Sequence, residues 1–322
     1  MSFKLFDRRL ILVSGKGGVG KTSVAAALAL LAARQGLKTL LCELDPEGGL
    51  ARLFKVAGAS GGEPQPLKTD NLHFLFVDVE AALEEYLSIY MRFKAFYRPI
   101  VKSPAMRYFL RAAPGFKELL TIGKIWWEEQ LVEGRPKRHR WDTIIVDAPA
   151  TGHGISFMGV SHATVGMVRL GPIKSQAQRM VDALQDPGRT SLVIVTIPEE
   201  MPVNETIELA NRSYKELGIH LGPIIINLMP CEVFGEKELN AYHELHHRAD
   251  NAKNSSPALR SIFKLSDIGI KRRELALSYV KKLRETLPDP PFIEIPQIPD
   301  WNWDRETIDK MADCLMKGLD SD

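Results

Sequence analysis

Cysteine is scarce in this chain of 322 residues. Its three cysteines, Cys42, Cys231 and Cys314, lie far apart and form no C-x-x-C pair. A disulfide framework and a compact zinc site both require paired or closely spaced cysteines. Neither is predicted, so no structural zinc is expected. A shared iron–sulfur cluster, which needs cysteine ligands, is set aside for the same reason.

Long apolar runs are also missing. The longest, Val24 to Ala33, is far shorter than the stretch of about 20 residues that spans a bilayer. The first ten residues, MSFKLFDRRL, lack the apolar core of a signal peptide. Together with the unpaired cysteines, these features predict a cytoplasmic protein without a membrane anchor.

Excess charge of one sign is absent too, because 42 Lys and Arg residues face 40 Asp and Glu residues, a formal net charge of +2. Nucleic-acid partners usually require clustered basic residues, so none is predicted. Apolar residues make up 45% and charged residues 25% of the chain, as in ordinary globular proteins. The length suits one large α/β domain over residues 1–322, with an insertion.

Apolar, β-branched runs alternate with helical patterns along most of the chain. The runs are RRLILVS, KTLLCEL, LHFLFVDV, DTIIVDA, SLVIVTI, GPIIINL and PFIEIP. Such alternation predicts an α/β fold with a mostly parallel, doubly wound sheet covered by helices on both faces. Near the C-terminus, residues 256–287 predict one long or broken helix, and residues 304–319 a closing helix.

Residues 79–141 break this rhythm with helical spacing rich in aromatic residues. We expect an inserted α-helical subdomain there, adjoined by residues 154–186. Its borders are the segments GASGGEPQP and EGRPKRHR, whose composition is typical of exposed connections. Residues 80–141 hold 12 basic and 7 acidic residues, a net charge of +5. This charge is compatible with an acidic partner, with peripheral membrane contact, or simply with a solvated helical face.

The segment SGKGGVGKTS follows the first predicted strand and opens the first predicted helix. It matches the phosphate-loop pattern G-x-x-x-x-G-K-[ST] in the context that confirms it. Glycines let backbone N–H groups point at phosphate oxygens, the lysine neutralises the β- and γ-phosphates, and the threonine hydroxyl faces Mg²⁺. ATP or ADP and Mg²⁺ are therefore the predicted cofactors. The predicted nucleotide-binding residues here are Gly15, Gly17, Gly18, Val19, Gly20, Lys21, Thr22 and Ser23.

Lys16 is a second lysine that such a loop does not need. A cation beside the first glycine can point toward a neighbouring subunit and act there as a catalytic finger. Arginine fingers of this kind accelerate phosphoryl transfer by about 10³ to 10⁵. We therefore predict that Lys16 is catalytic in trans. An exposed lysine that the loop merely tolerates is the alternative.

The segment GKGGVGKT resembles the deviant Walker A loop of the SIMIBI class of P-loop NTPases, which form dimers. This class includes partition, septum-site, nitrogenase-iron and arsenical-pump ATPases. The segments CELDPEGGL and VDAPATGHGISF resemble switches I and II of the arsenical-pump and tail-anchored-protein-targeting ATPases, and TIPEEMPVNET and IIINLMP resemble their later segments. The resemblance covers nearly the whole chain and implies an ATP-hydrolysing dimer.

Two acidic residues end predicted strands. Asp45 is expected beside the phosphate loop, where its carboxylate positions the attacking water. The alternative is a capping role for Asp45 ahead of Pro46, because Asp-Pro is also a helix-start signal. Asp147 ends the run TIIVD as a Walker-B acid does. Thr22, Asp45 and Asp147 are the predicted Mg²⁺ ligands, partly through water.

The resemblance assigns further roles. Gly152 and His153 fall in switch II, where Gly152 is expected to sense the γ-phosphate. Asn227 is expected to contact adenine, with Pro296 and Pro299 as a wall; packing roles for these three are equally compatible with the sequence.

Two other histidines invite a metal-binding hypothesis. His139 and His162 have no cysteine or carboxylate partner at ligand spacing. We therefore predict hydrogen-bonding roles rather than metal binding for these residues and for His153.

The chain departs from its relatives in three ways. It lacks a cluster of thiols for arsenite, it carries one phosphate loop where arsenical-pump ATPases carry two, and Cys231 stands alone where targeting factors have a zinc-binding C-x-x-C pair. A second subunit must therefore complete the site. The predicted partner is another copy of the chain or a paralogue.

We expect a dimeric ATPase whose open and closed states bind and release a client protein through the helical subdomain, with membrane-protein targeting as one such task. Methionine and aromatic residues there suit an adaptable apolar surface, although the same pattern is typical of a core. The alternatives are a metalloid-transport ATPase subunit, a septum-site or partition-like spatial regulator, and the nucleotide-binding half of a heterodimeric scaffold.

Overall fold

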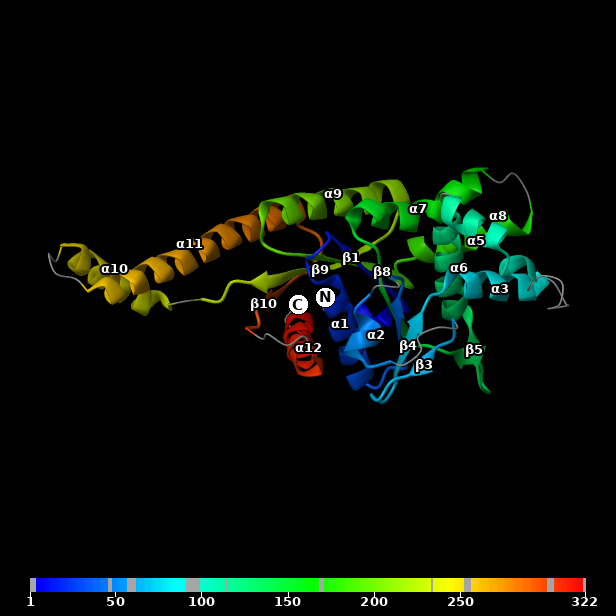
Figure 1. Cartoon of the computed structure of the whole chain (residues 1–322), viewed down its shortest axis with the longest axis horizontal. Helices are drawn as coiled ribbons and strands as arrows, with labels where there is room; N and C mark the ends of the chain where they lie inside the picture. Colours follow the sequence, from blue (N-terminus) through cyan, green and yellow to red (C-terminus); the bar gives the residue numbers. More distant parts are fainter. Residues whose placement is uncertain are drawn as a thin grey trace.

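A parallel β-sheet forms the centre of the molecule in the computed structural model (Figure 1). The structure describes residues 4–45, 48–56, 62–90, 99–113, 115–167, 171–232, 234–251, 256–299 and 304–320. Within these ranges one sheet has eight strands in the order β10-β9-β8-β1-β7-β2-β4-β3. Neighbouring strands pair in parallel except β3, which runs antiparallel to β4. The predicted α/β fold with a mostly parallel sheet is confirmed.

Strands β1, β7, β8 and β9 are buried almost throughout, which explains their continuous apolar runs. All seven predicted runs form strands, and short β3 was not predicted. The bounds are β1 Leu10–Gly15, β2 Thr39–Glu43, β3 Gln65–Pro66, β4 Leu72–Phe76, β7 Thr143–Asp147, β8 Thr190–Thr196, β9 Leu221–Met229 and β10 Phe292–Pro296.

Helices cover both faces of the sheet (Figure 1). A short 3-10 turn, Leu5–Asp7, precedes β1. One face carries α1 (Lys21–Arg34), α2 (Leu50–Leu53) and α12 (Arg305–Asp320). The other carries α6 (Phe116–Gln130), α7 (Thr151–Met167), α8 (Pro172–Gln185) and α9 (Glu200–Leu217).

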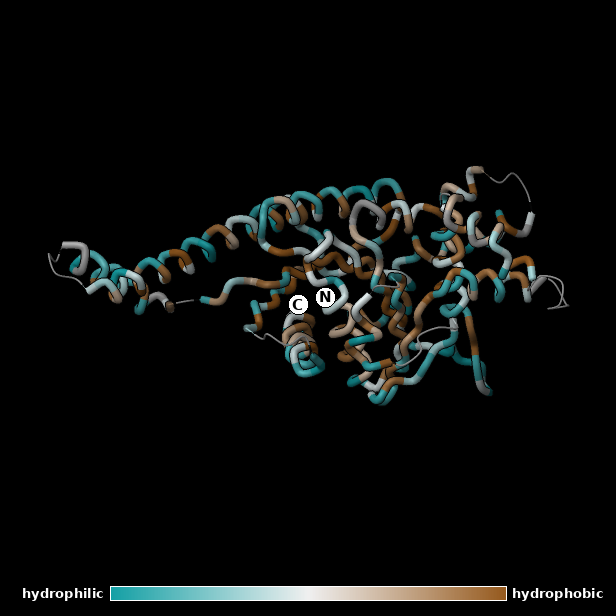
Figure 2. The backbone as a smooth tube through the Cα atoms, viewed as in Figure 1, coloured by the Kyte–Doolittle hydropathy of each residue, from teal (hydrophilic) through white to brown (hydrophobic). Residues whose placement is uncertain are grey.

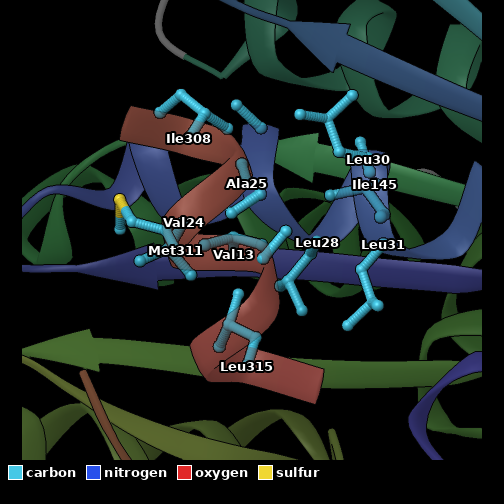
Figure 3. Packing of buried hydrophobic residues seen from close by; sticks show 14 of the residues in the cluster. Val13, Val24, Ala25, Leu28, Leu30, Leu31, Ile145, Ile308, Met311 and Leu315 are labelled. Carbon is cyan, nitrogen blue, oxygen red and sulfur yellow. The ribbon is translucent and has the colours of Figure 1, made fainter. Parts of the chain in front are cut away.

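Helix α1 is apolar nearly all round because it lies between the sheet and α12. Its residues from Ser23 to Ala33 are all buried, as expected of a helix covered on every side. In Figure 3, Val24 and Leu28 of α1 lie close to Met311 and Leu315 of α12. This packing fixes the start of α1, and with it the end of the phosphate loop.

Within the described part of residues 79–141, the structure includes helices α3 (Val79–Tyr90), α5 (Pro104–Ala112) and α6. They share a small core that includes Leu83 and Leu110, and α6 also packs on α7 and α8. The helical spacing did not predict the antiparallel ribbon of β5 (Val132–Glu133) and β6 (Arg138–His139) in this range. Trp141 belongs to the main core. Residues 91–98 lie outside the described residues, and the separate inserted subdomain stays a prediction.

A helical arm extends away from the end of the sheet at β9 and β10 (Figure 1). It consists of α10 (Glu236–Asn251) and α11 (Pro257–Thr286). Helix α11 runs unbroken over 30 residues. Tyr242 of α10 packs on Phe263 of α11 and donates a hydrogen bond of 2.8 Å to Asp267. Polar and apolar residues alternate along the arm (Figure 2). Its exposed apolar side chains include Leu245, Leu259, Ile262, Leu265, Ile268, Leu275 and Leu277.

None of the helices in the described ranges combines the length and the apolar character needed to cross a membrane.

A buried carboxylate joins the end of α6 to the base of the sheet. Glu129, 3% exposed, accepts hydrogen bonds of 2.7 Å from Arg9 and 2.6 Å from Arg189. Burial by itself raises the pKa of Glu129, but the hydrogen bonds and charges of Arg189 and Arg9 outweigh it and hold that pKa below its usual value. The carboxylate is therefore ionised and paired at neutral pH.

We predict that Glu129→Ala lowers the free energy of unfolding by about 3 kcal/mol, because removing one partner of a buried ion pair leaves the other charges uncompensated. Glu133→Ala is the matched control: the Glu133 side chain is 53% exposed, so its pairs with Lys38 and Arg140 contribute about 1 kcal/mol or less. Urea unfolding measures both variants. Equal losses would contradict the assignment.

Candidate functional site

The phosphate loop joins β1 to α1 and lies in close contact with the backbone of β8 and with a side chain of β9. Gly15, Gly18 and Gly20 have φ angles of +148°, +84° and +93°. A Cβ atom on Gly15 would lie 2.1 Å from the carbonyl oxygen of Val195, and one on Gly20 would lie 2.4 Å from the amide nitrogen of Asn227. Only glycine satisfies both the backbone angle and the space at these two positions.

The loop's lysine lies between two cavities of about 550 Å³ each. Lys21 Nζ donates a hydrogen bond of 3.1 Å to the carbonyl oxygen of Lys16. Burial lowers the pKa of Lys21, and the nearby Asp147 carboxylate opposes this effect. Lys21 and Thr22 line both cavities, which therefore form two halves of one site.

The first half of the site contains Asn227 and Pro296, whose predicted contact with adenine stays a prediction. Asn227 is buried near the end of β9, and its amide nitrogen donates a hydrogen bond of 2.9 Å to the carbonyl oxygen of Val19. Its side chain thus already supports the phosphate loop. Pro299 is exposed, beyond the end of β10. The lining residues are Gly18, Gly20, Lys21, Thr22, Ser23, Asn227, Leu228, Ile295, Pro296, Ile298, Thr307 and Met311.

The second half brings Asp45, Asp147 and Thr22 together. Thr22 Oγ1 donates a hydrogen bond of 2.7 Å to Asp147 Oδ2, whereas Asp147 Oδ1 is buried and has no hydrogen-bond partner among the described residues. Burial raises the pKa of Asp147 to about 6; the Thr22 hydrogen bond and Lys21 oppose the rise, and Glu43 and Asp45 add to it.

The donors in this half fit Mg²⁺, the ion that the phosphate loop implies. Carboxylate and hydroxyl oxygens are the ligands that Mg²⁺ takes beside substrate phosphates. The buried Asp147 Oδ1 is an acceptor that a cation or its water would satisfy.

Sequence reasoning missed Glu43. This residue pairs with Asp147 in the register of β2 and β7, and its carboxylate accepts hydrogen bonds from the backbone N–H groups of Leu50 (2.7 Å) and Ala51 (3.3 Å). Burial raises the pKa of Glu43. The Glu43 carboxylate thereby links the end of β2, which precedes Asp45, to the start of α2. Its one sequence signal is an acidic residue inside an otherwise apolar strand.

Sequence reasoning also missed Glu205, the partner of Lys16. The Lys16 ammonium forms an ion pair with the carboxylate of Glu205 on α9. In this structure the Lys16 ammonium group therefore contacts a residue of its own chain. The predicted role of Lys16 in a neighbouring subunit stays a prediction.

The segment that resembles switch II forms the start of α7. Gly152 and His153 lie in the first turn of this helix, but their side chains fall outside the described residues, as does Pro46 in the segment that resembles switch I. Their switch roles stay predictions. The preceding loop is tied to the phosphate loop, because Ser14 Oγ donates a hydrogen bond of 3.0 Å to the carbonyl oxygen of Pro149.

Of the three histidines predicted to form hydrogen bonds, His139 and His162 do not line either half of the site. His139 Nδ1 lies 3.2 Å from the carbonyl oxygen of Glu129, and His162 Nε2 lies 3.0 Å from the side-chain nitrogen of Gln185. Across the ranges that the structure describes, no three His, Cys, Asp or Glu side chains gather as metal ligands.

A mostly parallel sheet, a glycine loop between β1 and α1, a lysine and threonine at the start of α1, and a carboxylate at the end of β7 together define a P-loop nucleoside triphosphatase. The family of anion-transporting ATPases matches residues 8–181 and 166–275. The chain belongs to this family.

Two relatives illustrate the similarity. The ATPase BagA of Mycobacterium tuberculosis is 34% identical over 228 residues, which cover 70% of this chain and 66% of the relative. The arsenical pump-driving ATPase of Acidiphilium multivorum is 29% identical over 230 residues, covering 64% of this chain and 36% of the relative. The chain thus spans just under two thirds of the first relative and little more than one third of the second.

We predict that Gly20→Ala destabilises the nucleotide-free chain by about 1–3 kcal/mol, because the new methyl group meets Asn227 in a backbone conformation that strains any other residue. Gly17→Ala is the control, since a Cβ there meets nothing within 4 Å. Urea unfolding without nucleotide or Mg²⁺ distinguishes the two. Similar midpoints would show that the loop relaxes around the methyl group.

We predict that Asp147 makes the nucleotide-free chain less stable as the pH rises. Between the ordinary pKa of 3.8 and the folded value of about 6, the folded state keeps a proton that the unfolded state loses, so stability falls with rising pH. The free energy of unfolding of the parent relative to Asp147→Asn should drop by roughly 3 kcal/mol across this window. A pH-independent difference in urea unfolding would contradict the predicted ionisation.

Proposed function

We propose that this chain hydrolyses ATP with Mg²⁺ as a dimer, and that the cycle drives binding and release of a client protein. The observation that carries the proposal is the position of helix α6. Lys117 and Thr121, in the first two turns of α6, line the half of the site that holds Asp45 and Asp147. Other residues of α6, from Phe116 to Trp127, line an apolar cavity. One helix thus touches both the hydrolysis site and the client surface.

The chemistry is attack of water on the γ-phosphorus of ATP. The new bond forms to the water oxygen, the bond to the bridging oxygen breaks, and ADP and phosphate leave. Asp45 orients the water, and Lys21 neutralises the β- and γ-phosphates. Thr22 and Asp147 would hold Mg²⁺, which supplies charge neutralisation at the phosphates when bound. Asn227 and Pro296 border the space for the base.

A second subunit completes the site in this proposal. Lys16 supplies its ammonium to the triphosphate of the partner, which is another copy of the chain or a paralogue. Two lysines in one loop support this division of work, since Lys21 alone serves the chain's own phosphates.

The client is a protein with an apolar segment. A cavity of about 230 Å³ opens between α3, α6 and α8, and Tyr86, Trp126 and Trp127 contribute aromatic walls. Met180 also lines the cavity, and methionine side chains adapt to varied apolar ligands. Helix α5, which packs on α6, adds two exposed aromatic side chains, Tyr108 and Phe109. Delivery of membrane proteins is one task that this surface suits.

We predict that Lys16→Ala retains ATP binding but lowers the rate of hydrolysis by about 10³ or more, because the trans cation is lost. Lys21→Ala is the contrast and should lose binding as well. Phosphate release at saturating ATP and equilibrium binding of a fluorescent ATP analogue measure the two effects. Unchanged turnover in Lys16→Ala would refute the trans role.

We predict that Asp45→Asn traps an ATP-bound dimer together with its client, since the attacking water is no longer positioned. The trap is purified from cells and its partners are identified by mass spectrometry. The double variant Asp45→Asn, Lys21→Ala is the control that cannot retain ATP. Membrane proteins with apolar tails, enriched only in the trap, would support delivery. Recovery of a paralogue alone would favour a heterodimeric scaffold instead.

A further inference from the structure

We propose that Glu205 is a positioning residue, which holds Lys16 within its own chain until a second subunit presents ATP. The inference rests on the proposed function, because it assumes that Lys16 acts on the partner's triphosphate. It adds the residue that restrains Lys16 beforehand. Glu205 lies on α9, outside both halves of the site described above.

The fold places Glu205 beside the phosphate loop for a simple topological reason. Strand β8 is the parallel neighbour of β1, and Gly15 pairs with Val195 at the end of both strands. The chain then turns at residues 197–199 and enters α9, so the second turn of this helix stands next to Lys16.

The backbone and the side chain of Lys16 have different partners. Its carbonyl oxygen accepts a hydrogen bond from Lys21 of the same loop, while its ammonium group pairs with Glu205. The side chains of Lys16 and Glu205 are 31% and 28% exposed. The pair is therefore reached by solvent, and the side chain can leave while the loop backbone stays in place.

The expected restraint is mild, since ion pairs of this exposure bias an equilibrium only several-fold. A triphosphate carries several negative charges and attracts an ammonium more strongly than one carboxylate does. ATP in a docked partner can thus displace Glu205, whereas an empty partner offers no competing charge. The pair thereby opposes dimer closure without nucleotide.

The test is Glu205→Gln, which keeps the shape of the side chain and removes its charge. We expect the ATP-dependent dimer to form at roughly 3- to 10-fold lower protein concentration. The protein concentration that gives half-maximal hydrolysis should fall by the same factor, and kcat should stay unchanged. Glu208→Gln is the matched control: Glu208 lies one turn further along α9, pairs with Arg212 and should change neither quantity. Sedimentation velocity and phosphate release measure these values.

Two further variants separate the possible results. In a Lys16→Ala background, Glu205→Gln should have no effect on dimerisation, because the pair is already broken. Glu205→Asp keeps the charge on a shorter stem and should behave between the parent and Glu205→Gln. A lower kcat or weaker dimer in Glu205→Gln would overturn the restraint while leaving the trans role of Lys16 intact. Full activity of Lys16→Ala would instead overturn the proposed function itself.

Discussion

The close fit of the phosphate loop against two neighbouring strands is the constraint on which the rest of the site depends. Gly15 presses on the carbonyl oxygen of Val195 in β8, and Gly20 presses on the amide of Asn227 in β9. These contacts leave no room for a side chain at either glycine, and the hydrogen bond from Asn227 to the carbonyl oxygen of Val19 holds the loop against β9. Lys21 and Thr22 are therefore presented at a fixed place between the two halves of the site.

Two carboxyl groups lie beside this part of the site, and burying their negative charge destabilises the nucleotide-free protein. Asp147 and Glu43 are adjacent in the register of β7 and β2, and burial raises the pKa of each carboxyl group. Glu43 gains compensation from the backbone N–H groups that it binds, whereas Asp147 keeps one oxygen without a partner among the described residues. A carboxylate with a buried, unpaired oxygen attracts a cation. The same arrangement that destabilises the nucleotide-free chain therefore favours binding of a cation at this site.

What the sequence could predict follows from how local each signal is. The apolar strands and the glycine loop were predicted correctly, since strand runs, the turn and the helix start are encoded by adjacent residues. The ion pair of Lys16 with Glu205 joins residues 189 positions apart, and no spacing rule indicates it. The projecting arm was missed as well: residues 256–287 predicted a helix, but its direction depends on packing against β9 and α9. The ribbon of β5 and β6 has two residues in each strand, too few for an alternating pattern.

Helix α6 gives the proposed cycle a mechanical route. At its end, Glu128 accepts hydrogen bonds from Lys124 (2.8 Å) and from Trp141 (2.9 Å), and Glu129 is paired with two arginines. The contacts with Trp141 and with the two arginines anchor the end of the helix to the base of the sheet. Its first turn, beside the phosphate half of the site, has no such network among the contacts described. A displacement caused by nucleotide would therefore move the first turn more than the anchored end. Since Phe116 and Leu119 of this first turn belong to the wall of the apolar cavity, opposite residues of α3 and α8, the width of the cavity would change with the state of the nucleotide.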